Sequence, residues 1–289
     1  MVAHAEVETP ARLEAANTMS AHRNAPIGVF DSGLGGLSVW LEIDRMMPAE
    51  DCLYIADTAY VPYGVRSPEE IRARSIAVAG FLIERGVKLV VVACNTASAI
   101  AIDDLRREFP ETTFVGLEPA VKPAVGMSMT GKIGVLATPR TVSGDRLRVL
   151  IEHWSDGVKV HSIAGNGMVE LVESGKLEGE AVNTVLAPIL DPLLENQTDV
   201  IVLGCTHYPF LRNAIQEYVG AEVRIIDSGN AIARRTLNLL QESRLLHERG
   251  LLGGLEMYAT GDSQAATEVA SRLISREIEV THVDVPSRT

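Results

Sequence analysis

Short runs of hydrophobic residues alternate along the chain with longer segments in which hydrophobic residues recur every three or four positions. Several short runs are continuously apolar, which is typical of parallel strands buried on both faces. The longer segments have the spacing of amphipathic helices. Strands are predicted at 26–30, 52–56, 88–93, 113–117, 132–137, 158–163, 199–203, 223–226 and 255–259. Helices are predicted at 68–85, 97–108, 143–155, 180–195 and 230–247. This alternation predicts the α/β class with parallel sheets.

The composition narrows the function classes. The 289 residues include 26 Lys and Arg against 38 Asp and Glu, a formal charge of −12 at pH 7, and 46% are hydrophobic. This length predicts roughly two domains, each with enough apolar residues to bury a core. Only 4% of the residues are aromatic. We expect no nucleic-acid binding, because it needs clustered cations and stacking surfaces. An anionic substrate would have to be held by local donors.

The ends of the chain and its cysteines indicate a cytoplasmic protein. No apolar run reaches the roughly 18 residues of a membrane span, and the first 25 residues lack the apolar core of a signal peptide. Residues 1–24 are polar and patternless, and we predict a mobile extension. The cysteines Cys52, Cys94 and Cys205 are too few and too widely spaced for a disulfide framework, and none has the spacing of a metal site.

Cys94 and Cys205 occupy equivalent places in two similar segments. Residues 89–97 and 200–207 each contain an apolar run, a small residue, a cysteine and then hydroxyl or amide side chains before a helix. Ligands bind at the carboxyl ends of strands in open α/β sheets, so we expect both thiols in one cleft between two similar domains. Helix N-termini lower a thiol pKa from about 8.5. The alternative is a buried core side chain, which is our interpretation of Cys52.

Other polar residues follow predicted strands. Asp31 precedes Gly33, Gly35 and Gly36, which permit close backbone approach but form neither a P-loop nor a complete dinucleotide fingerprint. Asp31 either caps the next helix or orients a group that transfers protons. His207 follows the second strand-end cysteine by two residues, which places an imidazole next to a thiol, as in acid–base pairs.

The chain resembles the cofactor-independent glutamate racemases of bacterial cell-wall synthesis in five segments that occur in the family's order. These segments are FDSGLGGLSV (30–39), DTAYVPYG (57–64), VVACNTAS (91–98), IGVLATPRTV (133–142) and VLGCTHYP (202–209). The likeness runs from about Pro26 to Asp227 and continues through IDSGNAIARRT (226–236). The N-terminal extension and the end of the chain lie outside the diagnostic part.

The resemblance implies two α/β domains that face each other across a central cleft. The first would comprise 25–116 with 227–289, and the second 117–226. The reaction would interconvert L- and D-glutamate and supply D-glutamate for peptidoglycan, with no cofactor and no metal. A pyridoxal enzyme would need a Schiff-base lysine, and we interpret Lys88, Lys122 and Lys132 as ordinary surface charges.

The resemblance also implies roles for single residues. Cys94 would take the proton from D-glutamate, assisted by Asp31, and Cys205 would take it from L-glutamate, assisted by His207 and Glu173. By its own pattern Glu173 is a solvated helix residue, and only the resemblance gives it a role. The residues that would bind the substrate are Asp31, Ser32, Tyr63, Gly64, Asn95, Thr96, Thr141, Thr206 and His207. The likeness to extended Gram-negative members suggests a cell-wall precursor as an effector at the extension, and a homodimer is compatible with the family.

Three other functions stay open at this point. A two-thiol racemase of the same architecture could act on aspartate or on a hydantoin, because the pocket that selects side-chain length is not visible in the sequence. A related decarboxylase would need only one thiol, so the pair Cys94 and Cys205 counts against it. A binding protein with an inactive cleft is the alternative from another class.

Overall fold

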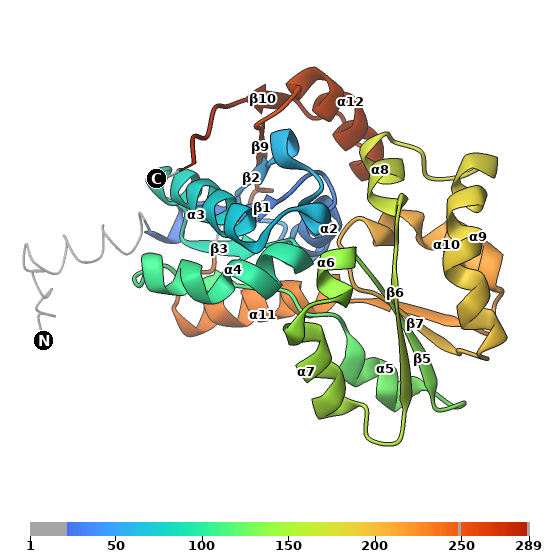
Figure 1. The fold of residues 1–289 in the computed structure, drawn as a ribbon. Coiled ribbons are helices and arrows are strands. Elements are labelled where there is room, and N and C mark those ends of the chain that lie inside the picture. Colours follow the sequence, from blue (N-terminus) through green and yellow to red (C-terminus); the bar gives the residue numbers. More distant parts are fainter. Residues whose placement is uncertain (1–21, 248–249, 288–289) are drawn as a thin grey trace, which may run out of the picture.

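A computed structural model of the chain describes residues 22–247 and 250–287, and it has two lobes, each built on one sheet (Figure 1). Every strand pair in the two sheets is parallel. In spatial order the six-stranded sheet contains β10 (Val280–His282), β9 (Leu255–Ala259), β2 (Cys52–Ala56), β1 (Ile27–Asp31), β3 (Leu89–Val92) and β4 (Phe114–Val115). The four-stranded sheet contains β6 (Lys159–Ala164), β5 (Lys132–Ala137), β7 (Val200–Leu203) and β8 (Arg224–Asp227).

Helices cover both sheets, and α11 and α12 return late in the chain to the lobe of the six-stranded sheet (Figure 1). The α-helices are α2 (Leu37–Met46), α3 (Pro68–Glu84), α4 (Asn95–Glu108), α5 (Val121–Met127), α6 (Pro139–Val142), α7 (Asp145–Trp154), α8 (Met168–Glu173), α9 (Glu180–Glu195), α10 (Arg212–Val219), α11 (Gly229–Glu242) and α12 (Ser263–Ile274). The 3₁₀ turns are η1 (Thr58–Tyr60), η2 (Tyr63–Val65) and η3 (Tyr208–Leu211).

The predicted α/β class with parallel sheets is confirmed, and a strand is present at each predicted position. The prediction missed β10, which is short and has only one buried residue. It also missed α2, α5, α6, α8, α10 and α12. The predicted extension, 1–24, lies outside the described residues except for its last three.

The helix predicted at 230–247 ends at Glu242, five residues earlier than expected. Arg244 adopts a left-handed conformation with φ 58°. This conformation lets the amide of Leu245 donate to the carbonyl of Leu240 at 2.8 Å, and the amide of Arg244 donates to Gln241 at 3.1 Å. These are the two hydrogen bonds of a Schellman cap. The prediction ran past Glu242 because the hydrophobic spacing continues there and carries no signal for such a cap.

Buried apolar side chains join the two lobes. One cluster includes Val29 and Trp40 from the first lobe and Leu136, Leu186 and Leu203 from the second. Separate clusters fill the other face of each sheet. Because the largest cluster is shared, apolar contacts continue from one lobe into the other.

Lys88 is not the surface charge that its position before a strand predicted. Its side chain is 0% exposed and forms an ion pair with Glu50, which is 1% exposed. Its ammonium also donates to the carbonyls of Arg23 and Leu245, each at 3.0 Å. The second Glu50 oxygen accepts the amide of His247 at 2.7 Å. The pair therefore ties the start of the described chain and the segment after α11 to the amino ends of the inner strands β2 and β3.

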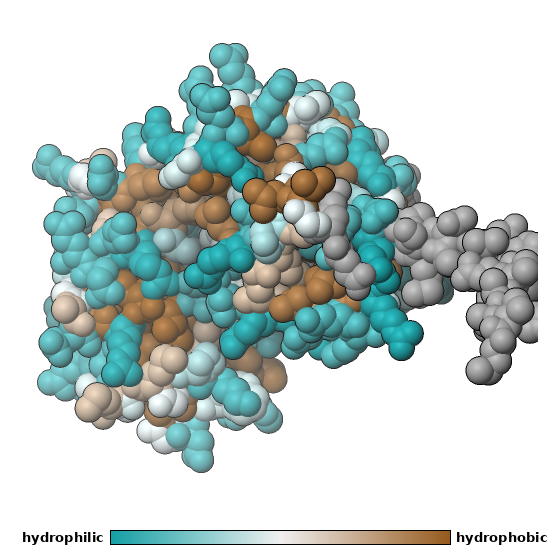
Figure 2. Space-filling model, turned by 180° about the vertical axis from the view of Figure 1, so that it is seen from behind, coloured by the Kyte–Doolittle hydropathy of each residue, from teal (hydrophilic) through white to brown (hydrophobic). Residues whose placement is uncertain are grey.

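The surface is predominantly hydrophilic on the face seen in Figure 2, with separate hydrophobic areas between the polar side chains. Among the described residues, the large hydrophobic side chains that are exposed include Val65, Met129, Val149, Leu251 and Leu252. Within residues 22–247 and 250–287, none of the helices combines the length and apolar character that crossing a membrane requires.

We predict that Lys88→Met destabilises the protein by about 3–5 kcal/mol, because it leaves the Glu50 carboxylate buried without its cation. Urea unfolding followed by circular dichroism measures the effect. Lys132→Met is the control, since its ammonium bonds only an exposed amide, Gln197, and should change stability by no more than about 0.5 kcal/mol. Equal effects of the two substitutions would contradict a structural role for the buried pair.

Candidate active site

Cys94 stands at the carboxyl end of β3 and is the N-cap residue of α4. Its sulfur accepts a hydrogen bond from the amide of Ala97 at 3.5 Å. Its thiol also donates a hydrogen bond to the Ser32 hydroxyl at 3.8 Å. The side chain is buried. The sequence thus placed this thiol correctly at a strand-to-helix junction.

Asp31 ends the neighbouring strand β1 and joins the two lobes. One carboxylate oxygen accepts the Ser32 hydroxyl at 3.0 Å, and the other accepts the hydroxyl of Thr206, from the second lobe, at 2.9 Å. The capping alternative for Asp31 is wrong, because α2 begins at Leu37 after Gly36 and has no side-chain cap. A relay of hydrogen bonds therefore runs from the Cys94 thiol through Ser32 to a fully buried carboxylate.

Cys205 follows β7 in the second lobe and begins a second relay. Its sulfur lies 3.7 Å from Nδ1 of His207. Nε2 of His207 lies 2.6 Å from Oε1 of Glu173, and the same oxygen accepts the amide of Leu34, from the first lobe, at 2.7 Å. No α-helix begins directly after Cys205, contrary to the sequence prediction, because η3 comes next and α10 starts only at Arg212. Glu173, at the end of α8, contacts His207 and is 16% exposed, so it is not the solvated helix residue that its own pattern indicates.

The environment of Cys94 opposes its ionisation. Burial raises the pKa of the Cys94 thiol well above its usual value, the charge of Asp31 raises it further, and the amide of Ala97 only partly compensates. The expected lowering of this pKa by the helix N-terminus is therefore wrong, since desolvation dominates. Burial also raises the pKa of Asp31, while the charge of His207 and the hydroxyl of Thr206 lower it.

The environment of His207, in contrast, favours its charged form. Burial lowers the pKa of His207, but its hydrogen bonds to Cys205 and Glu173 outweigh burial, and the pKa ends well above the usual value. The favoured form is thus an imidazolium, which can donate to the sulfur on one side and to the carboxylate on the other. For the third cysteine, Cys52, burial and the charge of Glu50 raise the pKa to about 12, so this thiol stays neutral.

The glycines after Asp31 admit side chains of the second lobe. A Cβ on Gly33 would lie 2.2 Å from Oε1 of Glu173, and a Cβ on Gly35 would lie 2.1 Å from Nδ1 of His207. Neither distance leaves room for a side chain. The close approach that the sequence predicted at this turn is therefore confirmed, and the groups that approach are protein side chains.

A cluster of threonine hydroxyls joins the lobes on another side of the site. Oγ1 of Thr96 lies 3.0 Å from that of Thr138 and 3.4 Å from that of Thr141. Thr138 and Thr141 are themselves 3.0 Å apart. Gly64 packs here, since a Cβ on it would lie 2.7 Å from Cβ of Thr138. Three residues predicted to bind substrate, Thr96, Thr141 and Gly64, therefore lie together.

Asn95 and Thr206 line a cavity of about 10 Å³ next to Cys205. This volume accommodates about one water molecule and is far smaller than a typical ligand pocket of roughly 300–1,000 Å³. The space beside Cys205 is therefore too small for a molecule of the size of an amino acid. Tyr63, another predicted binding residue, donates its hydroxyl to Asp57 at 2.5 Å.

Sequence reasoning missed Thr138 and Asp57. Thr138 opens the second domain's TPRT turn, and its hydroxyl caps α6 by accepting the amide of Thr141. Asp57 comes directly after β2, and Asp31 is the last residue of β1, so its place at the end of a buried strand was the signal that could have identified it. Asp57 accepts hydrogen bonds from Arg74 on α3, another residue that the sequence did not indicate.

The arrangement presents two buried thiols from two lobes, each attached to its own set of proton acceptors and donors. Cys205 and Asn95, the residue after Cys94, line the same small cavity, so the two thiols stand at one junction of the lobes. In the part of the chain that the structure describes, no group of three or more His, Cys, Asp or Glu side chains is placed to hold a metal ion.

Comparisons with known proteins agree on one family. The model of the Asp/Glu/hydantoin racemase family matches residues 27–236. A glutamate racemase of a Roseiflexus species is 46% identical over 256 residues, which are 88% of this chain and 94% of that protein. The crystal structure of a glutamate racemase isoform from Bacillus anthracis matches with a TM-score of 0.84 at 33% identity, covering 92% of this chain and all of that one.

A further solved structure carries ligands. Glutamate racemase from Escherichia coli, in complex with L-glutamate and the activator UDP-MurNAc-Ala, matches with a TM-score of 0.80 at 32% identity, covering 91% of this chain and 99% of that one. The family match spans both lobes and includes each of the residues described above at the junction of the lobes. The chain therefore belongs to the Asp/Glu/hydantoin racemase family, in which its relatives are glutamate racemases, and it is an isomerase.

Proposed function

We propose that the chain is a glutamate racemase that interconverts L- and D-glutamate by proton transfer between Cys94 and Cys205. The observation that carries the proposal is the placement of these two buried thiols, one from each lobe, at the same junction. The full-length similarity to glutamate racemases supports glutamate over aspartate and hydantoins as the substrate. It also counts against a decarboxylase and against a binding protein without activity.

The proposed mechanism uses one base on each face of the substrate α-carbon. The imidazolium of His207 can donate a hydrogen bond to a thiolate at Cys205, whereas Cys94 has the environment of a neutral thiol. In this state Cys205 removes the proton from L-glutamate, and Cys94 delivers its proton to the opposite face. The reverse reaction starts with the roles exchanged, with Asp31 accepting hydrogen bonds from the relay through Ser32.

Stabilising the carbanion is the main demand on the site, because the α-proton is a very weak acid. We propose that hydroxyl, amide and backbone donors hold the substrate carboxylate and the developing charge. The side chains that would contribute are Ser32, Asn95, Thr96, Thr141 and Thr206, with the backbone of Gly64. Activity without a cofactor stays a prediction, as do a cytoplasmic location, the supply of D-glutamate for peptidoglycan and a homodimer.

The domain division also stays a proposal, with 25–116 and 227–289 in one domain and 117–226 in the other. The two sheets support it, since strands β1–β4, β9 and β10 form one sheet and β5–β8 the other. Asp227 pairs with Leu203 in the second sheet, so the crossing back to the first domain begins just after β8.

A cell-wall precursor is our proposed effector, and a cavity of about 510 Å³ between the lobes supports a location for it. The cavity lies where the chain crosses between the sheets, near 116–120 and 226–232. Arg106, Arg146 and Arg234 line it, and guanidinium groups suit the phosphates of a nucleotide-linked sugar. The activator bound to the Escherichia coli enzyme is of this class. The N-terminal extension, where the sequence suggested the contact, lies outside the described residues up to residue 21.

For the mechanism, we predict that Cys94→Ser and Cys205→Ser each lower the racemisation rate by about 10²–10⁴-fold, because a serine hydroxyl is a much weaker acid than a thiol. Chiral chromatography of reactions in heavy water, with deuterium at the α-carbon followed by NMR, measures this loss. Cys52→Ser is the matched control and should stay close to the parent rate. Normal racemisation by both site variants would exclude the two-thiol mechanism.

For the substrate, we predict that pyridoxal-free protein converts L-glutamate to D-glutamate and leaves L-aspartate unchanged. Chiral chromatography of parallel incubations makes the measurement. Formation of D-aspartate alone would keep the fold and mechanism but change the substrate. If neither product forms in a folded sample, with or without UDP-MurNAc-Ala, the binding-protein alternative becomes the better one.

For the effector, we predict that Arg234→Ala weakens the response to UDP-MurNAc-Ala by at least roughly tenfold in half-maximal concentration, because it removes a charged partner of a phosphate. Arg235→Ala is the control, since this neighbour is also exposed but does not line the cavity. Activity titrations with and without the nucleotide measure the response. Equal responses of the two variants would place the effector elsewhere.

A further inference from the structure

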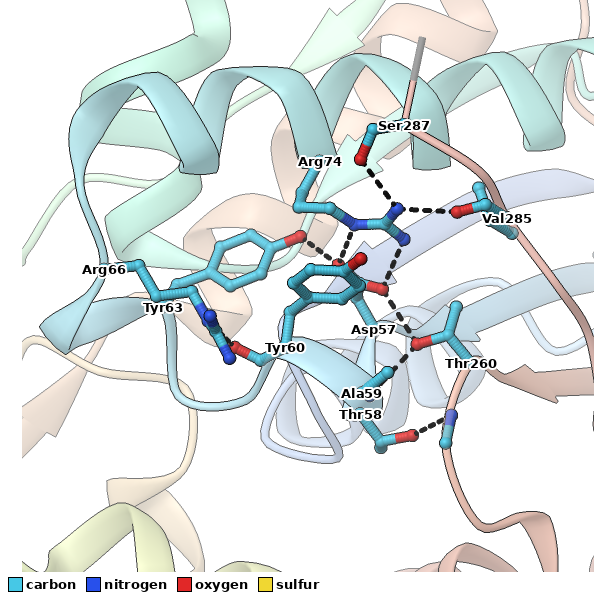
Figure 3. Close-up of polar contacts among 11 residues, drawn as sticks. Asp57, Thr58, Ala59, Tyr60, Tyr63, Arg66, Arg74, Thr260, Val285 and Ser287 are labelled. Carbon is cyan, nitrogen blue, oxygen red and sulfur yellow. Dashed lines mark hydrogen bonds and ion pairs between the residues drawn. The ribbon is translucent and has the colours of Figure 1, made fainter.

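A buried carboxylate outside the proposed catalytic relays collects hydrogen bonds from several distant segments (Figure 3). Asp57 follows β2 and is 0% exposed. Its two oxygens accept a bidentate ion pair from Arg74 on α3, at 2.8 and 3.0 Å. They also accept the hydroxyls of Tyr63 at 2.5 Å and Thr260 at 2.8 Å. A carboxylate with so many donors has a fixed orientation, because any rotation would break charged hydrogen bonds.

The guanidinium of Arg74 is held as firmly as its partner. It lies over the ring of Tyr60, 4.0 Å from the centroid. Its remaining nitrogen donates to the carbonyl of Val285 at 2.6 Å and to the hydroxyl of Ser287 at 3.3 Å. Figure 3 shows these two residues approaching from the C-terminal segment. The side chain of Arg74 thus joins α3 to the end of the described chain as well as to Asp57.

The turn after β9 is attached to the same place. The Thr260 hydroxyl that donates to Asp57 also accepts the amide of Ala59 at 3.1 Å. In return, the amide of Gly261 donates to the hydroxyl of Thr58 at 2.9 Å. Two late segments, 260–261 and 285–287, therefore fasten the loop of 57–66, although some 200 residues separate them in sequence.

This loop is the one that brings Tyr63 and Gly64 to the proposed substrate site. Gly64 packs against Thr138 of the threonine cluster, and the amide of Asp57 donates to the carbonyl of Asp31 at 2.9 Å. Burial and the charge of Asp57 raise the pKa of Tyr63 well above its usual value, so its hydroxyl stays protonated and remains a donor. The Tyr63 ring is buried. Its only polar side-chain atom thus points to Asp57.

We propose that Asp57 and Arg74 form a positioning centre for the Tyr63–Gly64 segment. The C-terminal segment completes this centre through Thr260 and Val285. The Tyr63 hydroxyl acts on Asp57 and not on the substrate. The inference rests on the proposed glutamate racemase function. It makes Arg74, Asp57 and Thr260 positioning residues, which determine how often the loop is in the form that binds glutamate.

The test compares Tyr63→Phe and Thr260→Val, which each remove one hydroxyl donor to Asp57 and keep the shape of the side chain. We expect each to raise KM for glutamate roughly three- to thirtyfold with a smaller change in kcat. The reason is that the apparent affinity falls in proportion to the fraction of the protein in the binding form. In the double variant the rise in KM should be smaller than the product of the two single rises, since both donors act on one carboxylate. Thr260→Ser, which keeps the hydroxyl, should restore KM.

The controls are Thr267→Val and Tyr218→Phe, which remove a hydroxyl that bonds the amide of Val280 and one that bonds Asp191, both away from the loop. They should leave KM and kcat unchanged, and circular dichroism confirms that each variant is folded. Loss of kcat in Tyr63→Phe with parent kinetics in Thr260→Val would overturn the proposal in favour of a direct contact with the substrate. Unchanged KM in both would also overturn it. An inactive parent protein would instead refute the proposed function itself.

Discussion

The hydrogen bond from the Thr206 hydroxyl to the Asp31 carboxylate joins the carboxyl ends of two parallel sheets. Within each sheet the parallel strands have their carboxyl ends on the same side, so the side chains that follow these strands gather at one end of the sheet. Because Asp31 is fully buried, it must find its donors nearby, and one of them comes from the opposite lobe. The rest of the site depends on this closure, which brings the segment of Cys94 and that of Cys205 into contact.

Closure constrains the residues that can stand between the lobes. Glu173 and His207 occupy the space where side chains of Gly33 and Gly35 would lie, so the glycine-rich turn and the relay of the second lobe depend on each other. Glu173 also accepts the amide of Leu34. The same contacts leave a cavity of only about 10 Å³ beside Cys205.

The two thiols stand in electrostatically different surroundings despite their similar sequence segments. A buried carboxylate accompanies Cys94, whereas an imidazole with a raised pKa accompanies Cys205. For the proposed racemisation this asymmetry is useful, because one thiol must carry a proton while the other lacks it. The buried centre around Asp57 extends the same principle to the binding loop, where one desolvated charge holds several segments in place.

The sequence by itself determined the α/β class, the positions of the principal strands and the placement of Cys94 and Cys205 at strand ends, because apolar periodicity and strand-end chemistry are local properties. It did not determine the short helices such as α6 and α8, the cap that ends α11 at Glu242, or the burial of Lys88. The tertiary structure alone decided that Glu173 meets His207 and that desolvation, not the helix N-terminus, dominates the pKa of Cys94. Burial and partner choice arise when segments distant in sequence pack together, and a local pattern carries no record of that packing.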